Sequence, residues 1–209
     1  MPHVVLLGDS IFDNGVYVPG HPAVIEQLRE ELPAGWQATL LAVDGNITVD
    51  VVRQLTKLPT DATHLAISTG GNDALLASSI LAQPARSVSD VLHELAEIQQ
   101  EFRREYREML AEVLARLLPT LVCTIYDAIP GLERDAVTAL GLFNDVILRE
   151  AFSACLPVLD LRLLCSERAD YSPLSPIEPS YLGGRKIAAA LAGILASHDF
   201  NRRESVVYR

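Results

Sequence analysis

Five short segments rich in apolar and β-branched residues recur along the chain. They are Val4–Leu7, Trp36–Val43, Thr63–Thr69, Pro119–Ile125 and Val158–Leu161. Segments of this length and composition are typical of buried strands. Glycine, asparagine or aspartate follows the first three, so the chain is expected to turn there.

Between these segments, apolar residues recur at the three- and four-residue spacing of amphipathic helices. The pattern predicts helices over Ala23–Leu32, Val49–Leu58, Ser87–Leu117, Asp135–Cys155 and Gly184–Ser197, with a short helix that Asp73 would cap. Strands that alternate with helices indicate an α/β protein with a parallel sheet covered on both faces. Five strands fit a flavodoxin-like sheet in the order 2-1-3-4-5.

The chain has 209 residues and neither an internal repeat nor a linker, so we expect one domain over residues 1–209. Residues 199–209 form a mostly polar C-terminal tail, which we expect to be only weakly ordered. The formal net charge of −10 argues against a nucleic acid or an anionic membrane as the partner.

Three cysteines, Cys123, Cys155 and Cys165, show no metal-binding spacing, so reduced thiols are expected. The N-terminus leads directly into the first strand, without the features of a signal peptide. No apolar run approaches the roughly 20 residues of a membrane span. Together these features favour a cytoplasmic location.

Three polar turns follow the first three predicted strands: Gly8-Asp9-Ser10, Asp44-Gly45-Asn46 and Gly70-Gly71-Asn72-Asp73. In a parallel sheet these turns lie at one edge, where α/β proteins bind ligands. They offer a hydroxyl, a glycine amide and a side-chain amide, which are the groups that acyl transfer needs for a nucleophile and an oxyanion hole. Each alone is more often a turn glycine or a helix cap.

These motifs resemble those of the GDSL, or SGNH, hydrolase family, and the resemblance covers nearly the whole chain. Gly8-Asp9-Ser10 is similar to its first block, Gly45 to its second, and Gly70-Gly71-Asn72-Asp73 to its third. The resemblance implies a three-layer α/β/α fold, Ser10 as the nucleophile, and an oxyanion hole made by Ser10, Gly45 and Asn72. It also implies an ester or acyl compound as the substrate, with no metal and no cofactor.

The fourth block of this chain differs from the family's Asp-x-x-His-Pro. The corresponding segment is Ser175-Pro176-Ile177-Glu178-Pro179, so Glu178 occupies the position of the histidine and Ser175 that of the aspartate. A serine hydroxyl is a poor nucleophile without a base. Glu178 is a base only if burial or neighbouring carboxylates raise its pKa. The alternative is a carboxylate that forms a hydrogen bond with Ser10 and does no chemistry.

Other residues near the same edge are candidates for a base or a metal ligand. His21 is the one histidine on a loop at the expected edge, because His64 begins the third strand and His93 lies on a helix. Four aspartates near this edge, Asp9, Asp13, Asp44 and Asp73, could hold a hard cation, but capping roles are commoner there.

Two functions therefore remain open. The first is an ester hydrolase in which Ser10 is acylated and Glu178 is an unusual base. The second is a catalytically impaired member of the same fold that binds a small acyl or sugar ligand without turnover. Fold alone does not decide between them.

Overall fold

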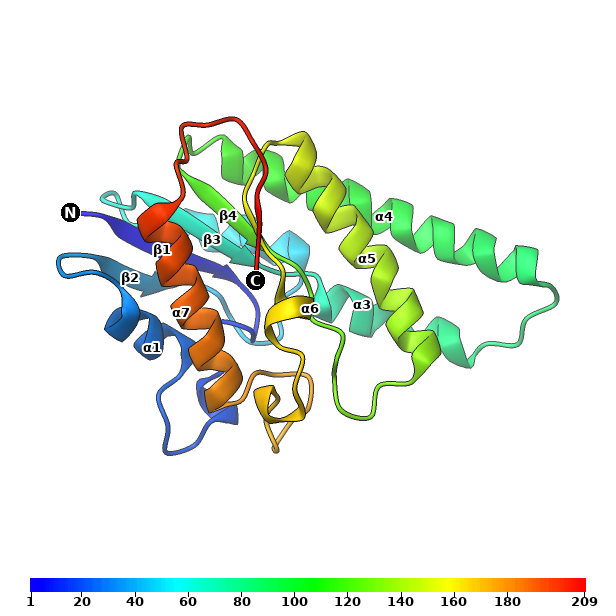
Figure 1. Cartoon of the computed structure of the whole chain (residues 1–209). Coiled ribbons are helices and arrows are strands. Elements are labelled where there is room, and N and C mark those ends of the chain that lie inside the picture. The colour runs from blue at the N-terminus through cyan, green and yellow to red at the C-terminus, as the bar shows by residue number, and fades with distance from the viewer.

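A computed structural model describes all residues, 1–209. Its centre is a parallel sheet of six strands in the order β2-β1-β3-β4-β5-β6 (Figure 1). The strands are β1 His3–Gly8, β2 Gln37–Leu40, β3 His64–Ser68, β4 Thr120–Cys123, β5 Val158–Leu159 and β6 Val207–Tyr208. The predicted α/β class and the order 2-1-3-4-5 are confirmed, and one strand is added at the edge.

The α-helices are α1 Val24–Glu31, α2 Val51–Gln54, α3 Gly71–Ala77, α4 Val88–Leu114, α5 Arg134–Ser153, α6 Leu161–Leu164 and α7 Tyr181–Ser197. Five 3-10 turns complete the chain: η1 Gly15–Tyr17, η2 Thr48–Asp50, η3 Leu55–Lys57, η4 Ser78–Ala82 and η5 Arg168–Asp170. None of these helices is both long enough and apolar enough to cross a membrane.

Alternating side chains of β1 supply the two cores on either side of the sheet. Val4 and Leu6 belong to a core with residues of α1 and α7, whereas Val5 and Leu7 belong to a core with residues of α4 and α5. This period of two is expected for a strand that is buried on both faces. Figure 1 shows α7 crossing in front of the sheet and α4 running beside α5. The chain therefore forms three layers.

The sixth strand corrects the expectation that residues 199–209 are weakly ordered. Val207 pairs with Val158, and Tyr208 pairs with Leu159. The His198 ring also forms a 2.8 Å hydrogen bond with the Tyr208 hydroxyl. Two residues are too few to show a strand pattern in the sequence, so tertiary contacts determine this strand.

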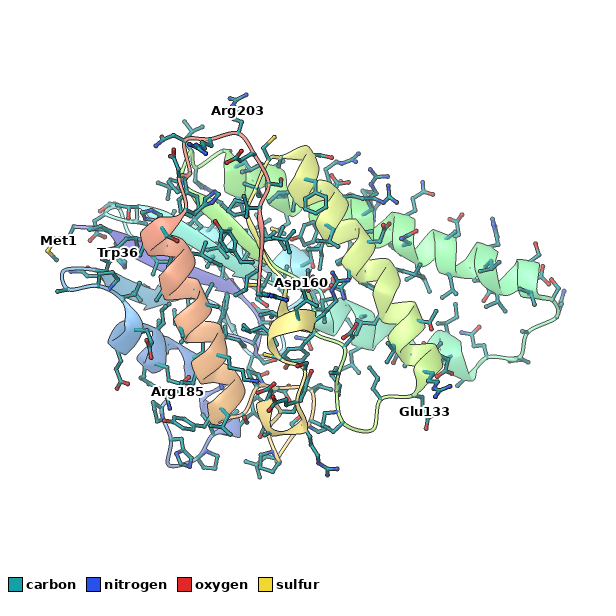
Figure 2. The ribbon with its side chains drawn as sticks, viewed as in Figure 1. Met1, Trp36, Glu133, Asp160, Arg185 and Arg203 are labelled. Atoms are coloured by element: carbon teal, nitrogen blue, oxygen red, sulfur yellow. The ribbon has the colours of Figure 1, made fainter.

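The parallel arrangement separates the two ends of the sheet. Met1 precedes β1 and Trp36 precedes β2, and Figure 2 shows both on the same side of the molecule. The His64 ring lies 5.0 Å from the Trp36 ring, so His64 is also at this end. Ser10, Gly45 and Asn72 follow the opposite, carboxyl ends of β1, β2 and β3.

Candidate active site

A tight turn places Ser10 just beyond the carboxyl end of β1. Gly8 adopts φ = +127°, and a Cβ atom built there would lie 1.7 Å from the carbonyl oxygen of Ser68 in β3. Only glycine combines this backbone angle with this close approach. The Asp9 amide then donates to the same carbonyl at 3.1 Å. Ser10 is consequently held at the end of the sheet, and it is only 6% exposed.

Glu178 is the hydrogen-bond partner of Ser10. The Ser10 hydroxyl donates to Oε1 of Glu178 at 3.5 Å, and Glu178 is only 4% exposed. The backbone holds this residue on both sides, because the Ser172 amide donates to the Glu178 carbonyl at 2.9 Å and Tyr126 Oη donates to the Ile177 carbonyl at 2.6 Å. Its other carboxyl oxygen, Oε2, is buried and has no hydrogen-bond partner.

Burial raises the pKa of the Glu178 carboxyl above its usual value. The charge of Asp44 raises it further, while hydroxyl groups of Ser175 and Ser10 oppose the change. Burial also raises the pKa of Asp9 to about 7, although the Ile11 amide stabilises its ionised form. The site therefore contains two carboxyl groups whose protons are held more tightly than in water.

The amide of Asn72 lies at the same site and is already oriented. Ser10, Asn72 and Glu178 all line one cavity of about 140 Å³. Asn72 Nδ2 donates to the carbonyl of Asn46 at 2.8 Å. An amide nitrogen carries two hydrogens, so one donor stays free for a ligand.

Gly45 is not among the residues that line this cavity. It lies on an exposed turn with φ = +78°, one residue before Asn46. Asn46 receives a second bond at its side chain, because Gln54 Nε2 donates to its Oδ1 at 2.9 Å. The structure thus brings Ser10, Asn72 and Glu178 together, and it connects Gly45 to them through Asn46.

Gln54, which belongs to none of the sequence motifs, joins these segments. Its Oε1 accepts from the Gly8 amide at 2.8 Å, and its Nε2 donates to the Gly8 carbonyl at 2.7 Å. Gln54 is buried within a short predicted helix. A glutamine on the apolar side of a helical pattern is the signal that could have identified it.

The four aspartates near this edge each accept hydrogen bonds from loops. Asp13 accepts from the Asp44 amide at 3.0 Å, and Asp44 accepts from Tyr17 Oη at 2.8 Å. Asp9 accepts from the Ile11 amide and Asp73 from Thr48. No group of three or more His, Cys, Asp or Glu side chains is arranged to hold a metal ion.

His21 is placed away from Ser10. Its ring stacks on Tyr181 at a centroid distance of 4.9 Å, and it does not line the cavity that contains Ser10. The residue in contact with the Ser10 hydroxyl is therefore a carboxyl group and not an imidazole.

Solved structures with the same fold include lipases and esterases. An extracellular lipase from Streptomyces rimosus is 18% identical with a TM-score of 0.66, covering 95% of this chain and 100% of that chain. A lipase from a goat rumen metagenome is 18% identical with a TM-score of 0.72, covering 92% and 97%. A psychrotrophic esterase from Pseudoalteromonas sp. is 14% identical with a TM-score of 0.65, covering 94% and 100%.

At this identity the three structures establish a shared fold and no more. No curated protein matches the sequence. The family model described as the GDSL-like lipase/acylhydrolase family matches residues 6–183, which include the turns after β1, β2 and β3 as well as Glu178. The chain therefore belongs to the GDSL-like lipase/acylhydrolase family.

Proposed function

We propose that this protein is a serine ester hydrolase in which Glu178 is the general base, in place of the histidine of the family's Asp-x-x-His-Pro block. The observation that carries the proposal is the contact between the Ser10 hydroxyl and a buried carboxyl group with a raised pKa. A base is most effective when its pKa lies near the working pH. Burial raises the pKa of Glu178 toward that pH.

In the first step, Ser10 Oγ attacks the carbonyl carbon of the ester while its proton passes to Glu178. The negative oxygen that forms is stabilised by the Asn72 side chain and by the backbone amide of Ser10. The Gly45 amide, which the family resemblance implies as a third donor, lies on a turn outside the cavity and has no part in this step. The bond to the alcohol oxygen then breaks, and Glu178 returns the proton to the leaving alcohol. The product is an acyl ester on Ser10.

In the second step, Glu178 takes a proton from a water molecule, which attacks the acyl ester. Collapse of the second tetrahedral species returns the proton to Ser10 and releases the carboxylic acid. Glu178 must be ionised at the start of both steps. Activity is therefore expected to rise with pH through the raised pKa of Glu178 and then to level off.

A second function, ligand binding without turnover, is favoured by one distance. The Ser10–Glu178 separation of 3.5 Å is longer than the 2.5–3.0 Å usual for a strong hydroxyl hydrogen bond. Catalytic hydrogen bonds are often long before substrate binds, so the hydrolase remains the better proposal. If the protein binds a ligand in this pocket and does not hydrolyse it, ligand binding replaces hydrolysis as the proposed function.

The deciding experiment is labelling and kinetics with Glu178→Gln. A fluorophosphonate should label Ser10 in the parent protein and not in Ser10→Ala, and Ser197→Ala is a control on an exposed serine. Glu178→Gln should lower the hydrolysis of an activated ester by roughly 10²–10⁴-fold, because an amide does not accept the proton. Glu167→Gln, an exposed carboxyl of the preceding loop, should keep the parent rate.

Restoring the family pair by Ser175→Asp with Glu178→His tests the pocket separately. A large gain in rate would mean that only the base limits the natural protein. If the parent shows neither labelling nor hydrolysis and the double variant shows no gain, the hydrolase proposal fails and ligand binding replaces it.

A further inference from the structure

The cavity at Ser10 is polar at one end and apolar elsewhere. Of its 26 lining residues, 18 are hydrophobic. Of the other eight, Ser78 belongs to η4 and Glu178 to the loop before α7. The remaining six lie just after β1 or between the end of β3 and the start of α3: Asp9, Ser10, Ser68, Thr69, Gly71 and Asn72. The cavity therefore leads from the reacting groups into a hydrocarbon environment.

Helices on one face of the sheet build the apolar part. Leu140 and Phe143 of α5 are buried there, and Ile98 of α4 lies on the neighbouring helix. Leu75 and Leu81 belong to α3 and η4 and also line the cavity, but they are 53% and 40% exposed. The cavity thus extends from the buried helix pair toward solvent.

The size of the cavity limits its occupant. An apolar cavity of roughly 150 Å³ in another protein stays dry and holds benzene, a molecule of six carbons. This cavity is of similar size, at about 140 Å³. A sugar is a poor fit for the apolar part, because its hydroxyl groups would be buried without partners.

We infer that the cavity binds an unbranched hydrocarbon chain of about six carbons that belongs to the substrate ester. The inference rests on the proposed function of Ser10, because the chain must be attached to the scissile bond. Leu75 and Leu81 line the cavity and are partly exposed, so longer chains would extend into solvent on that side. A plateau in reactivity, and not a sharp fall, is therefore expected beyond about eight carbons.

The kinetic test compares p-nitrophenyl esters with acyl chains of two to twelve carbons. Burial of each methylene should raise kcat/KM about fourfold, so hexanoate should exceed acetate by roughly 10²-fold. A parallel series of acetate esters of straight-chain alcohols tests the alcohol half of the substrate. A rise in either series identifies the half that enters the cavity, and no rise in either overturns the inference.

A space-filling variant shows whether the rise comes from this cavity. Ala139 lies on α5 and lines the cavity, so Ala139→Phe should remove the chain-length dependence, and hexanoate should then react no faster than acetate in this variant. Thr138→Phe adds the same ring to an exposed position of the same helix and should keep the dependence. A dependence that persists in Ala139→Phe would place the chain elsewhere and overturn the inference.

A binding measurement separates this inference from the proposed chemistry. In the Ser10→Ala variant, 1-hexanol should raise the melting temperature and ethanol should not, and the added Ala139→Phe substitution should abolish the effect. Hexanol binding without any ester hydrolysis would keep the cavity assignment and reject the hydrolase. Ester hydrolysis that is insensitive to chain length, without hexanol binding, would keep the hydrolase proposal and reject the cavity assignment.

Discussion

Asp9 is a fully buried carboxyl group beside the reacting serine, and it is not needed as the base in the proposed reaction. Burial is the main cause that raises its pKa to about 7, and the charges of Asp73, Glu178 and Asp44 add to it. A group that binds its proton more tightly in the folded state than in the unfolded state makes stability depend on pH. For Asp9, the stability of the folded protein changes with pH between the usual pKa of 3.8 and the raised pKa of about 7.

We expect Asp9→Asn to remove part of the pH dependence of unfolding. Protonated Asp9 stabilises the folded protein below pH 4, and this stabilisation is lost as pH rises toward 7. Between pH 5 and 8 the parent should therefore lose roughly 2–3 kcal/mol relative to the variant. Urea unfolding at several pH values measures the difference, with exposed Asp199→Asn as the control. Parallel pH profiles for parent and Asp9→Asn would contradict the assignment.

The alignment of motifs predicted that Ser10, Asn72 and Glu178 gather at the site, but not that Gly45 lies outside the cavity or how deeply each residue is buried. Ser10 and Glu178 are 168 positions apart and touch in the structure, as the alignment of motifs implied. The burial of Asp9 was not predictable, because its neighbours Gly8 and Ser10 give no apolar pattern. The cavity was missed for a related reason: its lining is spread over several helices whose apolar faces look like ordinary core.

Two helices attach to the ends of strands through side-chain amides. Asn144 of α5 accepts from the Ile125 amide and donates to the Ile125 carbonyl, both at 2.8 Å. Gln54 of α2 binds Gly8 in the same two-bond manner. Gly8 is the last residue of β1 and Ile125 lies two residues beyond the end of β4, so these amides supply hydrogen-bond partners to backbone groups where the strands end.

We expect Asn144→Leu to destabilise the protein by about 2–5 kcal/mol. The substitution nearly keeps the side-chain volume but leaves two buried backbone groups without partners, each worth about 1–3 kcal/mol. The free energy of unfolding in urea is the measurement, and Asn201→Leu in the exposed tail is the matched control. A loss below 1 kcal/mol would mean that water replaces the amide.

Long elements were predicted more accurately than short ones. The expected helix Ser87–Leu117 is α4, Val88–Leu114, because its apolar face persists over many turns and Ser87 caps its first turn. The last helix begins at Tyr181 and not at Gly184, because Ser180 accepts from the amides of Leu182 and Gly183. Two successive glycines concealed this start, since glycine is unfavourable within helices.

The two faces of the whole molecule have different roles. The face covered by α1 and α7 packs the larger hydrophobic core, with 26 buried residues, and helps to anchor the loop that carries Glu178. The face covered by α4 and α5 (Figure 1) holds a core of 20 buried residues, and the cavity lies beside them. Substrate preference is therefore expected to change through substitutions on the α4–α5 face.

Removal of residues 205–209 should lower stability without affecting Ser10. The Val158 amide donates to the Val206 carbonyl and the Asp160 amide to the Tyr208 carbonyl, so truncation leaves two groups of the β5 edge unpaired. A cost of about 2 kcal/mol corresponds to a fall in Tm of roughly 4–8 °C for a domain of this size. Calorimetry measures the fall, while fluorophosphonate labelling should continue. An unchanged Tm would show that β6 contributes nothing to stability.

The close approaches at Gly8 and Gly183 also limit which genetic changes the protein can survive. A Cβ at Gly8 would lie 1.7 Å from the Ser68 oxygen, and one at Gly183 would lie 2.1 Å from the Asp170 oxygen. Every missense mutation of a glycine codon adds a Cβ atom, so none is conservative at these two positions. In a library of single-codon variants selected for folded protein, both positions should be empty of every substitution, whereas exposed Gly193, with no neighbour within 4 Å, should tolerate alanine.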